Sequence, residues 1–551
     1  MKFKILIIFS LFIFIQCFSQ ENKNEQFYFY VNIADVSSLI IKQKNNGLFS
    51  IISKYDKTET AIYNKYEIST FKIAYPNTEK ALFKNVYHIS TNDKNLLEKL
   101  QEKYPKKYTR ILEFFPAPNP YYPNDYGNTS PVKNLGNPYS SRDLDVINAP
   151  GAWSITKGNK KVIIGISDSR IDTLNIDMKG KIIKDLHPDN PARASDCSHG
   201  TNVAGIAFAR MDNAYGRAGI CSECDGISTR YGSFKYIEDL VDAGAKVINT
   251  SWAMCGMGSQ QDAINKRINE YYDDGIIIVA AAGNGRDCDR DKKSIGDKMY
   301  PASFDKVISV TGIFSEYPFI EDGFFTKDNI NYTHEIKDRR SGYFIIDEDG
   351  IMNPTPIEKG VQVNRAIDLL APRQGYLLGH EVCGKDVFFG GASSSSAPYV
   401  TGTIGLMWSV NYCLSSYEIE TILKLTSADV ENLNGNTPFK GMLGAGRLDA
   451  YNAVNMANNM KDPKGNILIS DRDFYRFDFK LERALNTITI QNQTFREDAT
   501  VDFKARKSIV VKPNTHLKPN ASTKIKLSIN PNVSQAECEP KPPKKYDRLF
   551  N

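Results

Sequence analysis

The chain has 551 residues, which at roughly 150 residues per domain suggests about three to four units and excludes a single small module. Hydrophobic residues make up 41% and charged residues 24%, a globular composition that excludes a collagenous or largely disordered chain. The 69 basic residues exceed the 64 acidic ones by five, which is too small an excess to indicate a nucleic-acid partner.

Residues 1–19 have the pattern of a secretory signal peptide. Lys2 and Lys4 precede an apolar run from Ile5 to Ile15, and Ser19 offers a small residue before the cut. The run is shorter than the about 20 apolar residues that a membrane-spanning helix needs. We therefore expect a secreted, extracellular or cell-surface protein with no integral membrane segment after signal cleavage.

Eight cysteines remain once Cys17 is removed with the leader. An even number in an oxidising compartment favours disulfides, but the sequence leaves their pairing open. Cys221 and Cys224 are separated by two residues, and no second such pair exists for zinc. A local disulfide or free thiols therefore fit this pair better than a redox or metal motif.

Residues 20–115 read as a small α+β unit, with a helix over 93–104 between extended segments at 85–90 and 108–115. Residues 116–143 follow as a proline-rich linker. We expect this linker to be exposed and to contain a maturation site, because such segments are readily cut by proteases.

From residue 144 to residue 460 apolar strands alternate with helices. The apolar runs at 162–166, 247–248 and 275–282 indicate a parallel sheet that is buried on both faces. This part of the chain is therefore expected to be the α/β core of the protein.

After Met460 the pattern changes to short alternating strands separated by turn residues, which predicts a small all-β domain over 461–535. The expected strands are 474–480, 487–491, 500–505, 508–512 and 523–529. No repeat at a solenoid period is evident. Residues 536–551 read as an unstructured tail.

Hydrolysis of a peptide bond needs a nucleophile, a base, an orienting carboxylate and a donor for the developing oxyanion. Asp168 ends a buried apolar strand, where open α/β sheets place functional groups. His199 opens a short helix of small residues, although a lone histidine is more often structural. Each of these signals is weak when taken alone.

Two further segments could supply the missing parts. Asn284 follows a buried strand, where it could donate to an oxyanion or simply form a turn. Ser394 lies in a four-serine run that opens an apolar helix, and Pro398 fits the first turn of that helix. The serine run could equally be a polar loop or a helix cap.

Taken together, these segments resemble the subtilisin-like serine peptidases, both in local motifs and in the order Asp, His, Asn, Ser along the chain. The similar segments extend over about 300 residues. They are 147–153 (INAPGAW), 199–205 (HGTNVAG), 247–251, 280–284 (AAAGN), 300–310, 368–372 and 446–450.

The resemblance implies a secreted serine endopeptidase in which Asp168 orients His199, His199 acts as base and then acid, and Ser394 attacks the carbonyl. Asn284 would hold the oxyanion. Family members bind the substrate backbone as an added strand. Here the binding segments would be Ser251, Trp252 and Ala253 on one side and Ala281, Ala282 and Gly283 on the other.

The resemblance also implies the architecture: a subtilisin-like three-layer sandwich with a mostly parallel sheet at 144–460. The α+β unit before it would be an inhibitory prosegment, so that the enzyme is made as a zymogen, and the β domain would follow. Protein or peptide substrates and the protein's own prosegment are the expected partners. No cofactor is expected to be required, and the acidic run 347–349 could be either a structural calcium loop or a solvated surface segment.

Three positions depart from the usual family pattern. Arg170, Asn202 and Ala392 stand where the family usually has glycine, histidine and glycine, respectively. None of these changes removes a catalytic side chain. They leave open an alternative in which the chain is a catalytically inactive binding or adhesion protein with the same fold.

Overall fold

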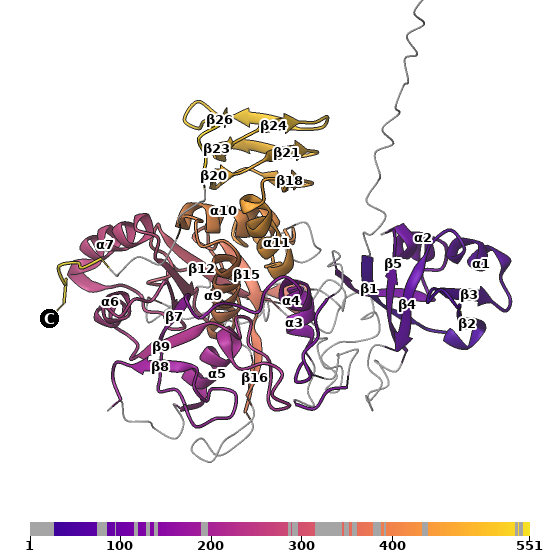
Figure 1. Cartoon of the computed structure of the whole chain (residues 1–551), viewed down its shortest axis with the longest axis horizontal. Coiled ribbons are helices and arrows are strands. Elements are labelled where there is room, and N and C mark those ends of the chain that lie inside the picture. The colour runs from indigo at the N-terminus through magenta and orange to yellow at the C-terminus, as the bar shows by residue number, and fades with distance from the viewer. Residues whose placement is uncertain are drawn as a thin grey trace, which may run out of the picture.

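The computed structural model describes residues 27–73, 85–93, 95–114, 120–127, 133–136, 141–188, 197–284, 288, 296–313, 344–346, 352–354, 361–377, 387–390, 393–431, 439–534, 538 and 544–550. Three folded parts follow one another along these residues (Figure 1). The predicted signal peptide and the acidic run 347–349 lie outside the described residues. The linker 116–143 was expected to be exposed, but among its described residues Asp125, Tyr126, Ser141 and Asp143 are buried, so that expectation was wrong for them. None of the described helices is long and apolar enough to cross a membrane.

The N-terminal part is a six-stranded antiparallel sheet carrying two helices, α1 (Lys57–Tyr63) and α2 (Asn95–Lys103). Leu96, Leu97 and Leu100 of α2 are buried together with apolar residues of the sheet. The predicted helix and its flanking strands are therefore present. The strands in spatial order are β2 (Leu39–Gln43), β3 (Phe49–Ser53), β4 (Ile68–Ile73), β5 (Val86–Thr91), β1 (Phe27–Ile33) and β6 (Tyr108–Phe114).

The central part is built on a seven-stranded sheet in which every neighbouring pair is parallel. Its inner strands are buried along their length, as expected of a sheet that is covered on both faces. The strands in spatial order are β15 (Leu369–Pro372), β12 (Val307–Ile313), β11 (Ile277–Ala281), β10 (Val247–Thr250), β7 (Ile163–Ser167), β9 (Asp225–Thr229) and β8 (Ile182–Asp185).

Helices cover both faces of this sheet. Successive residues of a strand point to opposite faces, so they pack against different helices. Val247 and Ile277 pack into one core, whereas Ile248 and Ile278 pack into a second core on the other face. The predicted three-layer α/β sandwich is therefore confirmed.

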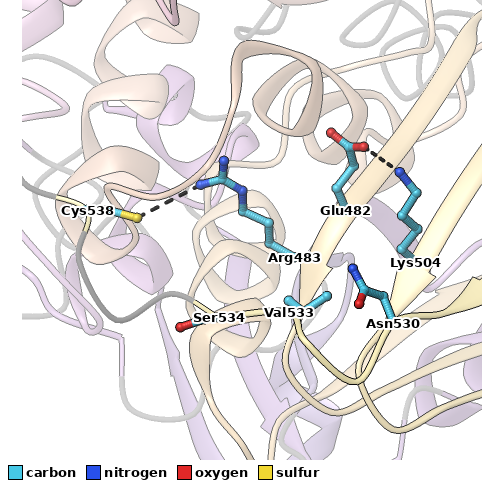
Figure 2. A pocket seen from close by; sticks show the side chains of 7 residues that line it. All are labelled: Glu482, Arg483, Lys504, Asn530, Val533, Ser534 and Cys538. Carbon is cyan, nitrogen blue, oxygen red and sulfur yellow. Dashed lines mark hydrogen bonds and ion pairs between the residues drawn. The ribbon is translucent and has the colours of Figure 1, made fainter.

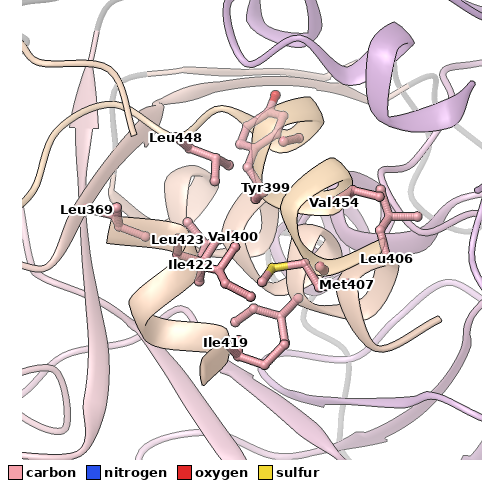
Figure 3. Close-up of a cluster of buried hydrophobic side chains, with 14 of the residues drawn as sticks. Leu369, Tyr399, Val400, Leu406, Met407, Ile419, Ile422, Leu423, Leu448 and Val454 are labelled. Atoms are coloured by element: carbon pink, nitrogen blue, oxygen red, sulfur yellow. The ribbon is translucent and has the colours of Figure 1, made fainter. Parts of the chain in front are cut away.

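The first core contains α5 (Cys197–Phe208), α9 (Ser393–Val410), α10 (Ser416–Thr426) and α11 (Ala450–Lys461). In Figure 3 the side chains of α9, α10 and α11 meet beside Leu369 of β15. The second core contains α6 (Phe234–Asp242) and α7 (Gln261–Asp273). The α9 helix is buried along nearly its whole length, which fixes the position of its N-terminus.

The C-terminal part is a parallel β-helix of three stacked rungs, so the expectation of no solenoid repeat was wrong. Asn466 pairs with Thr487 and Thr487 pairs with Ser508, so successive rungs begin 21 residues apart. Each rung has three strands, and equivalent strands stack in parallel into three sheets.

The rungs have the following bounds. The first consists of β18 (Asn466–Ser470), β19 (Asp473–Phe474) and β20 (Asp478–Ala484). The second consists of β21 (Thr487–Gln491), β22 (Thr494–Glu497) and β23 (Thr500–Ala505). The third consists of β24 (Ser508–Val511), β25 (His516–Pro519) and β26 (Ile525–Ile529). The single strand predicted at 474–480 is in fact divided by a turn in which Phe477 has a φ of 84°.

The prediction of an unstructured tail was also wrong for residues 544–550, which lie against α6 and α7 (Figure 1). Glu238 of α6 accepts hydrogen bonds from the backbone N–H groups of Leu549 and Phe550 at 2.8 and 3.3 Å. Arg548 forms ion pairs with Asp239 and Asp242. The tail is ordered because its basic and aromatic side chains match an acidic and apolar helix surface.

Three disulfides join described cysteines: Cys221–Cys224, Cys255–Cys288 and Cys413–Cys538. The first is the local pairing that the sequence left open as one option. The third links the segment before α10 to a residue that follows the last rung of the β-helix.

Candidate active site

Asp168 follows the last residue of β7 and therefore lies at the carboxyl edge of the parallel sheet. The residue is only 3% exposed. Its Oδ1 accepts a hydrogen bond from the backbone N–H of Ser169 at 2.7 Å. This contact holds the carboxylate in place at the edge where open α/β sheets bind their ligands.

His199 lies in the first turn of α5, and its Nδ1 is 2.6 Å from Oδ1 of Asp168. When Nδ1–H donates to this carboxylate, the neutral ring has its lone pair on Nε2. Gly200 allows the close approach of α5 to this loop, since an added Cβ would lie 2.1 Å from the carbonyl oxygen of Ser169. The sheet edge and the helix therefore hold an oriented imidazole.

Ser394 lies in the first turn of α9, and its hydroxyl donates to the carbonyl oxygen of Ser251 at 3.0 Å. The hydroxyl of Ser251 donates in return to the carbonyl oxygen of Ser394 at 2.8 Å. Ser251 directly follows β10, the neighbour of β7 in the sheet. Ser394 is thus fixed to the sheet edge at the strand next to that of Asp168.

Trp252 connects the same two strand ends. Its indole N–H donates to the hydroxyl of Ser167, the last residue of β7, at 3.0 Å. Ser167 directly precedes Asp168. The segment that holds Ser394 is therefore itself bonded to the segment that holds the Asp168–His199 pair.

Asn284 follows β11, the next strand along the sheet, and its side chain is exposed. Its Oδ1 accepts hydrogen bonds from the backbone N–H and the hydroxyl of Ser393, at 2.8 and 2.9 Å. The oxygen of the amide therefore faces α9, and the NH₂ group is left as the outward donor. Backbone N–H of Gly283 also donates to the hydroxyl of Ser393, at 3.1 Å.

The predicted site residues are thus linked in three pairs along one edge of the sheet. Asp168 contacts His199, Ser251 contacts Ser394, and Asn284 contacts the residue before Ser394. In this structure the hydroxyl proton of Ser394 is directed to Ser251 rather than to His199.

The two predicted substrate-binding segments are joined by further contacts. Trp252 and Ala253 are half-buried, whereas Ala281, Ala282 and Gly283 are buried. The Cys255–Cys288 disulfide links the chain just beyond these two segments. Met254 and Tyr300 exchange backbone hydrogen bonds at 2.9 and 2.7 Å. The spacing between the segments is therefore fixed.

Met299 fills the space beside the second segment. It is 2% exposed, and a Cβ added to Gly283 would lie 2.9 Å from its Cγ. Its sulfur lies 3.4 Å from Sγ of Cys288. Nothing in the sequence singled out Met299, because its place beside Gly283 depends on the fold.

Ser393 is the other residue that sequence reasoning missed. The four-serine run drew attention only to Ser394, and no sequence pattern distinguishes a serine that anchors an amide from one that caps a helix. Of the departures from the family pattern, Arg170 is exposed, Asn202 is buried in α5, and Ala392 lies outside the described residues.

The described residues contain no group of three or more His, Cys, Asp or Glu side chains arranged to hold a metal ion. The possible calcium loop at 347–349 falls outside those residues and stays a hypothesis. The sheet edge brings together an oriented imidazole, a serine at a helix N-terminus and an amide, which are residue types that acyl transfer uses.

Comparison with known proteins identifies the same region. A model of the subtilase family matches residues 159–446. A thermophilic serine proteinase of Bacillus sp. (strain AK1) is 32% identical over 174 residues, which are 29% of this chain and 41% of that protein. The cell wall-associated protease of Bacillus subtilis (strain 168) is 25% identical over 433 residues, which are 72% of this chain and 42% of that protein.

Thermitase of Thermoactinomyces vulgaris is 28% identical over 186 residues, which are 31% of this chain and 62% of that protein. The chain thus spans less than two thirds of the length of each of these relatives. The match to the family covers the parallel sheet and every predicted site residue.

Proposed function

Because the chain belongs to the subtilase family, we propose that it is a secreted serine endopeptidase made as a zymogen. The observation that carries this proposal is the 2.6 Å contact between His199 Nδ1 and the buried Asp168 carboxylate, at the sheet edge to which Ser394 is also fixed. The proteases named above are its relatives, and protein or peptide substrates are the corresponding proposal for this chain.

In the proposed reaction His199 Nε2 takes the hydroxyl proton of Ser394 as Oγ attacks the carbonyl carbon of the scissile bond. The new Oγ–C bond gives a tetrahedral intermediate. When the C–N bond breaks, the imidazolium returns the proton to the leaving amine. Water then attacks the acyl-enzyme in the same way and releases the acid product. Asp168 stabilises the imidazolium but keeps its own charge.

The developing oxyanion would accept hydrogen bonds from the NH₂ group of Asn284 and from the backbone N–H of Ser394. The contacts of Ser393 support this role, because they occupy the oxygen of the Asn284 amide and leave its NH₂ group as the donor. A preoriented donor stabilises charge without reorganisation at the moment of reaction.

The substrate backbone would bind as an extended strand between Ser251–Ala253 and Ala281–Gly283. Buried Met299 supports a preference for a small side chain on the acyl side of the scissile bond, because the space beside Gly283 is already filled. Alanine, glycine or serine would fit this position better than phenylalanine or leucine.

The N-terminal α+β unit would act as the inhibitory prosegment, and cleavage in the linker that follows it would release the mature enzyme. The export of several relatives supports secretion, since an extracellular and a cell wall-associated protease are among them. The three disulfides are consistent with an oxidising compartment.

A fluorophosphonate probe tests the proposal, since it reacts only with an activated serine. The secreted parent protein should be labelled at Ser394 and should process its own N-terminal unit. Ser394→Ala should lose both properties and accumulate as the precursor. Ser395→Ala is the matched control, because Ser395 is a buried neighbour whose hydroxyl has no hydrogen-bond partner among the described residues, and it should keep both properties.

An inactive binding protein is the alternative. A folded parent protein that resists the probe, or a Ser394→Ala variant that matures unaided as the parent does, would contradict the peptidase proposal. N-terminal sequencing of the secreted product identifies the maturation site at the same time.

A further inference from the structure

The two ends of the β-helix differ in how they are closed. The first rung faces α10, where the hydroxyl of Thr421 accepts from the backbone N–H of Lys480 at 2.8 Å. The buried carboxylate of Glu418 accepts from the backbone N–H groups of Glu482 and Arg483 at 2.8 and 2.9 Å. These side chains satisfy the outer strand edge of β20, so this end of the stack is capped.

The third rung forms the opposite end of the stack, farthest from the sheet of the central part (Figure 1). Its strands pair only with β21, β22 and β23 among the described residues. The outer edges of β24, β25 and β26 therefore present backbone N–H and C=O groups that no described residue pairs. Such an edge is a template for another strand.

The apolar interior is also open at this end. Ile488, Phe495 and Phe503 of the second rung are completely buried. Their partners in the third rung, Ile509, Leu517 and Leu527, are only half-buried. Solenoid proteins normally close such an end with a polar capping repeat. Here the last rung exposes part of the core instead.

The charge of the third rung differs from that of the first two. Residues 466–505 carry seven acidic and six basic residues, whereas residues 506–530 carry six basic residues and no acidic one. All six basic side chains are exposed, and no ion pair joins any of them to a described residue. They are Arg506, Lys507, Lys512, Lys518, Lys524 and Lys526.

In the inner rungs, unlike the third, a basic side chain can pair with an acidic one. An example lies in the cavity between β20, β23 and the segment after β26. In this cavity Lys504 pairs with Glu482 at 2.6 Å (Figure 2). A cation of the second rung thus has its anion within the protein. The cations of the third rung have no such anion among the described residues and are available to an external one.

We propose that the third rung, residues 506–530, is a docking surface for an acidic polypeptide segment that binds in extended form along the open strand edge. The occupant would add a further strand to the β-helix, cover the half-buried apolar residues and pair its carboxylates with the surrounding lysines. This surface is separate from the catalytic site and would hold a partner protein next to the peptidase.

Charge and hydrogen bonding together select this occupant. A second copy of the chain would bring six positive charges against six others, so self-association through this end is disfavoured. An anionic membrane would match the charge but would leave the backbone groups of the edge without partners in hydrocarbon. An acidic extended polypeptide supplies the charge, the apolar side chains and the backbone partners at once.

The test uses full-chain Ser394→Ala protein, so that the probe is not cut, and a fluorescent peptide of alternating glutamate and valine. Fluorescence anisotropy should show saturable binding that weakens as salt is added. A triple variant reverses the charge of one lysine at each strand of the third rung: Lys512→Glu directly after β24, Lys518→Glu in β25 and Lys526→Glu in β26. This variant should bind the peptide at least tenfold more weakly. The same peptide with proline in place of valine should also bind at least tenfold more weakly, since it cannot form the ladder.

The matched control reverses three exposed lysines of the central part, Lys160→Glu, Lys179→Glu and Lys184→Glu, which gives the same change in net charge. Binding should be unchanged in this variant. Equal loss in both triple variants, equal affinity for the proline peptide, tighter binding to phosphatidylglycerol vesicles than to the peptide, or dimerisation through residues 506–530 would each overturn the proposal.

Discussion

Asn284 depends on Ser393 for its orientation, because both donors of Ser393 contact the same amide oxygen. Without the hydroxyl of Ser393 only the backbone N–H would hold the amide. The resemblance of the motifs and their order along the chain predicted the four residues of the proposed chemistry, whereas a place after a strand or at the start of a helix is a weak signal by itself. They could not predict Ser393 or Met299, whose roles depend on contacts between distant segments.

Replacement of Ser393 should therefore act on the transition state. We expect Ser393→Ala to lower kcat about tenfold with little change in KM, a part of the about 10²–10³-fold loss that follows removal of a whole oxyanion donor. Ser393→Thr keeps the hydroxyl and should restore most of the activity. Steady-state kinetics on a peptide substrate measure both, and a loss confined to KM would argue against this positioning role.

Met299 should determine which side chain is accepted on the acyl side of the scissile bond. Met299→Gly removes the side chain that lies against Gly283, so cleavage after phenylalanine should rise at least tenfold relative to cleavage after alanine. The ratio of kcat/KM for two peptides that differ only at this residue gives the answer. An active parent enzyme that already prefers phenylalanine would contradict the assignment while leaving the peptidase proposal intact.

Among the secondary-structure elements, β7, β10 and β11 were predictable because burial on both faces gives them apolar runs, whereas β8 and β9 contain polar residues and were not singled out. The rungs of the β-helix were not recognised as a repeat, for a physical reason. Inward-facing residues do recur, as at Ile467, Ile488 and Ile509, 21 residues apart. Later in the rung the spacing lengthens, to 24 residues between Val501 and Ile525, because turns differ in length. No single period then describes the whole repeat.

The sheet of the N-terminal unit contains a buried histidine, His88 of β5, which lies beside Lys72 of β4. Burial, aided by the charge of Lys72, lowers the pKa of His88 from 6.5 to about 3. The unfolded chain therefore takes up a proton near pH 6.5 that the folded unit does not accept until about pH 3.

The stability of this unit should fall as the pH decreases from about 6.5 towards 3, by up to about 1.4 kcal/mol per pH unit from this group. His88→Leu should remove this contribution to the pH dependence of the free energy of unfolding. His516→Leu, a change at an exposed histidine of β25, should leave that pH dependence unchanged. Hydrogen exchange of β1 and β5 in the Ser394→Ala precursor, corrected for intrinsic rates, measures the slope. An identical slope in His88→Leu would contradict the assignment.

At the scale of the whole molecule, the C-terminal tail connects the end of the chain to the central part. Tyr546 packs edge-on against Tyr271, and Phe550 lies near Phe234. The sequence alone did not predict this order, because a short, proline-rich and charged segment has no periodicity of its own. Its structure depends on the surface formed by α6 and α7.

Deletion of residues 544–551 should lower the stability of the central part by about 1–3 kcal/mol, because the buried carboxylate of Glu238 loses two backbone donors. Lys544→Ala is the control, since it removes an exposed ion pair with Asp274 and a cation–π contact with Tyr546 but leaves the donors to Glu238, and it should cost less than about 1 kcal/mol. Thermal unfolding of both variants on the Ser394→Ala background provides the comparison. A deletion without effect would mean that the tail contributes no stability.

The Cys413–Cys538 bond spans 125 positions, and the whole β-helix lies within that interval. A protein with the proposed peptidase activity would be surrounded by copies of itself, so nicks in exposed turns would be expected. A single break anywhere between these two cysteines still leaves both fragments covalently attached. The accessory module could thus survive self-digestion without being shed, and nicking would become visible only after reduction.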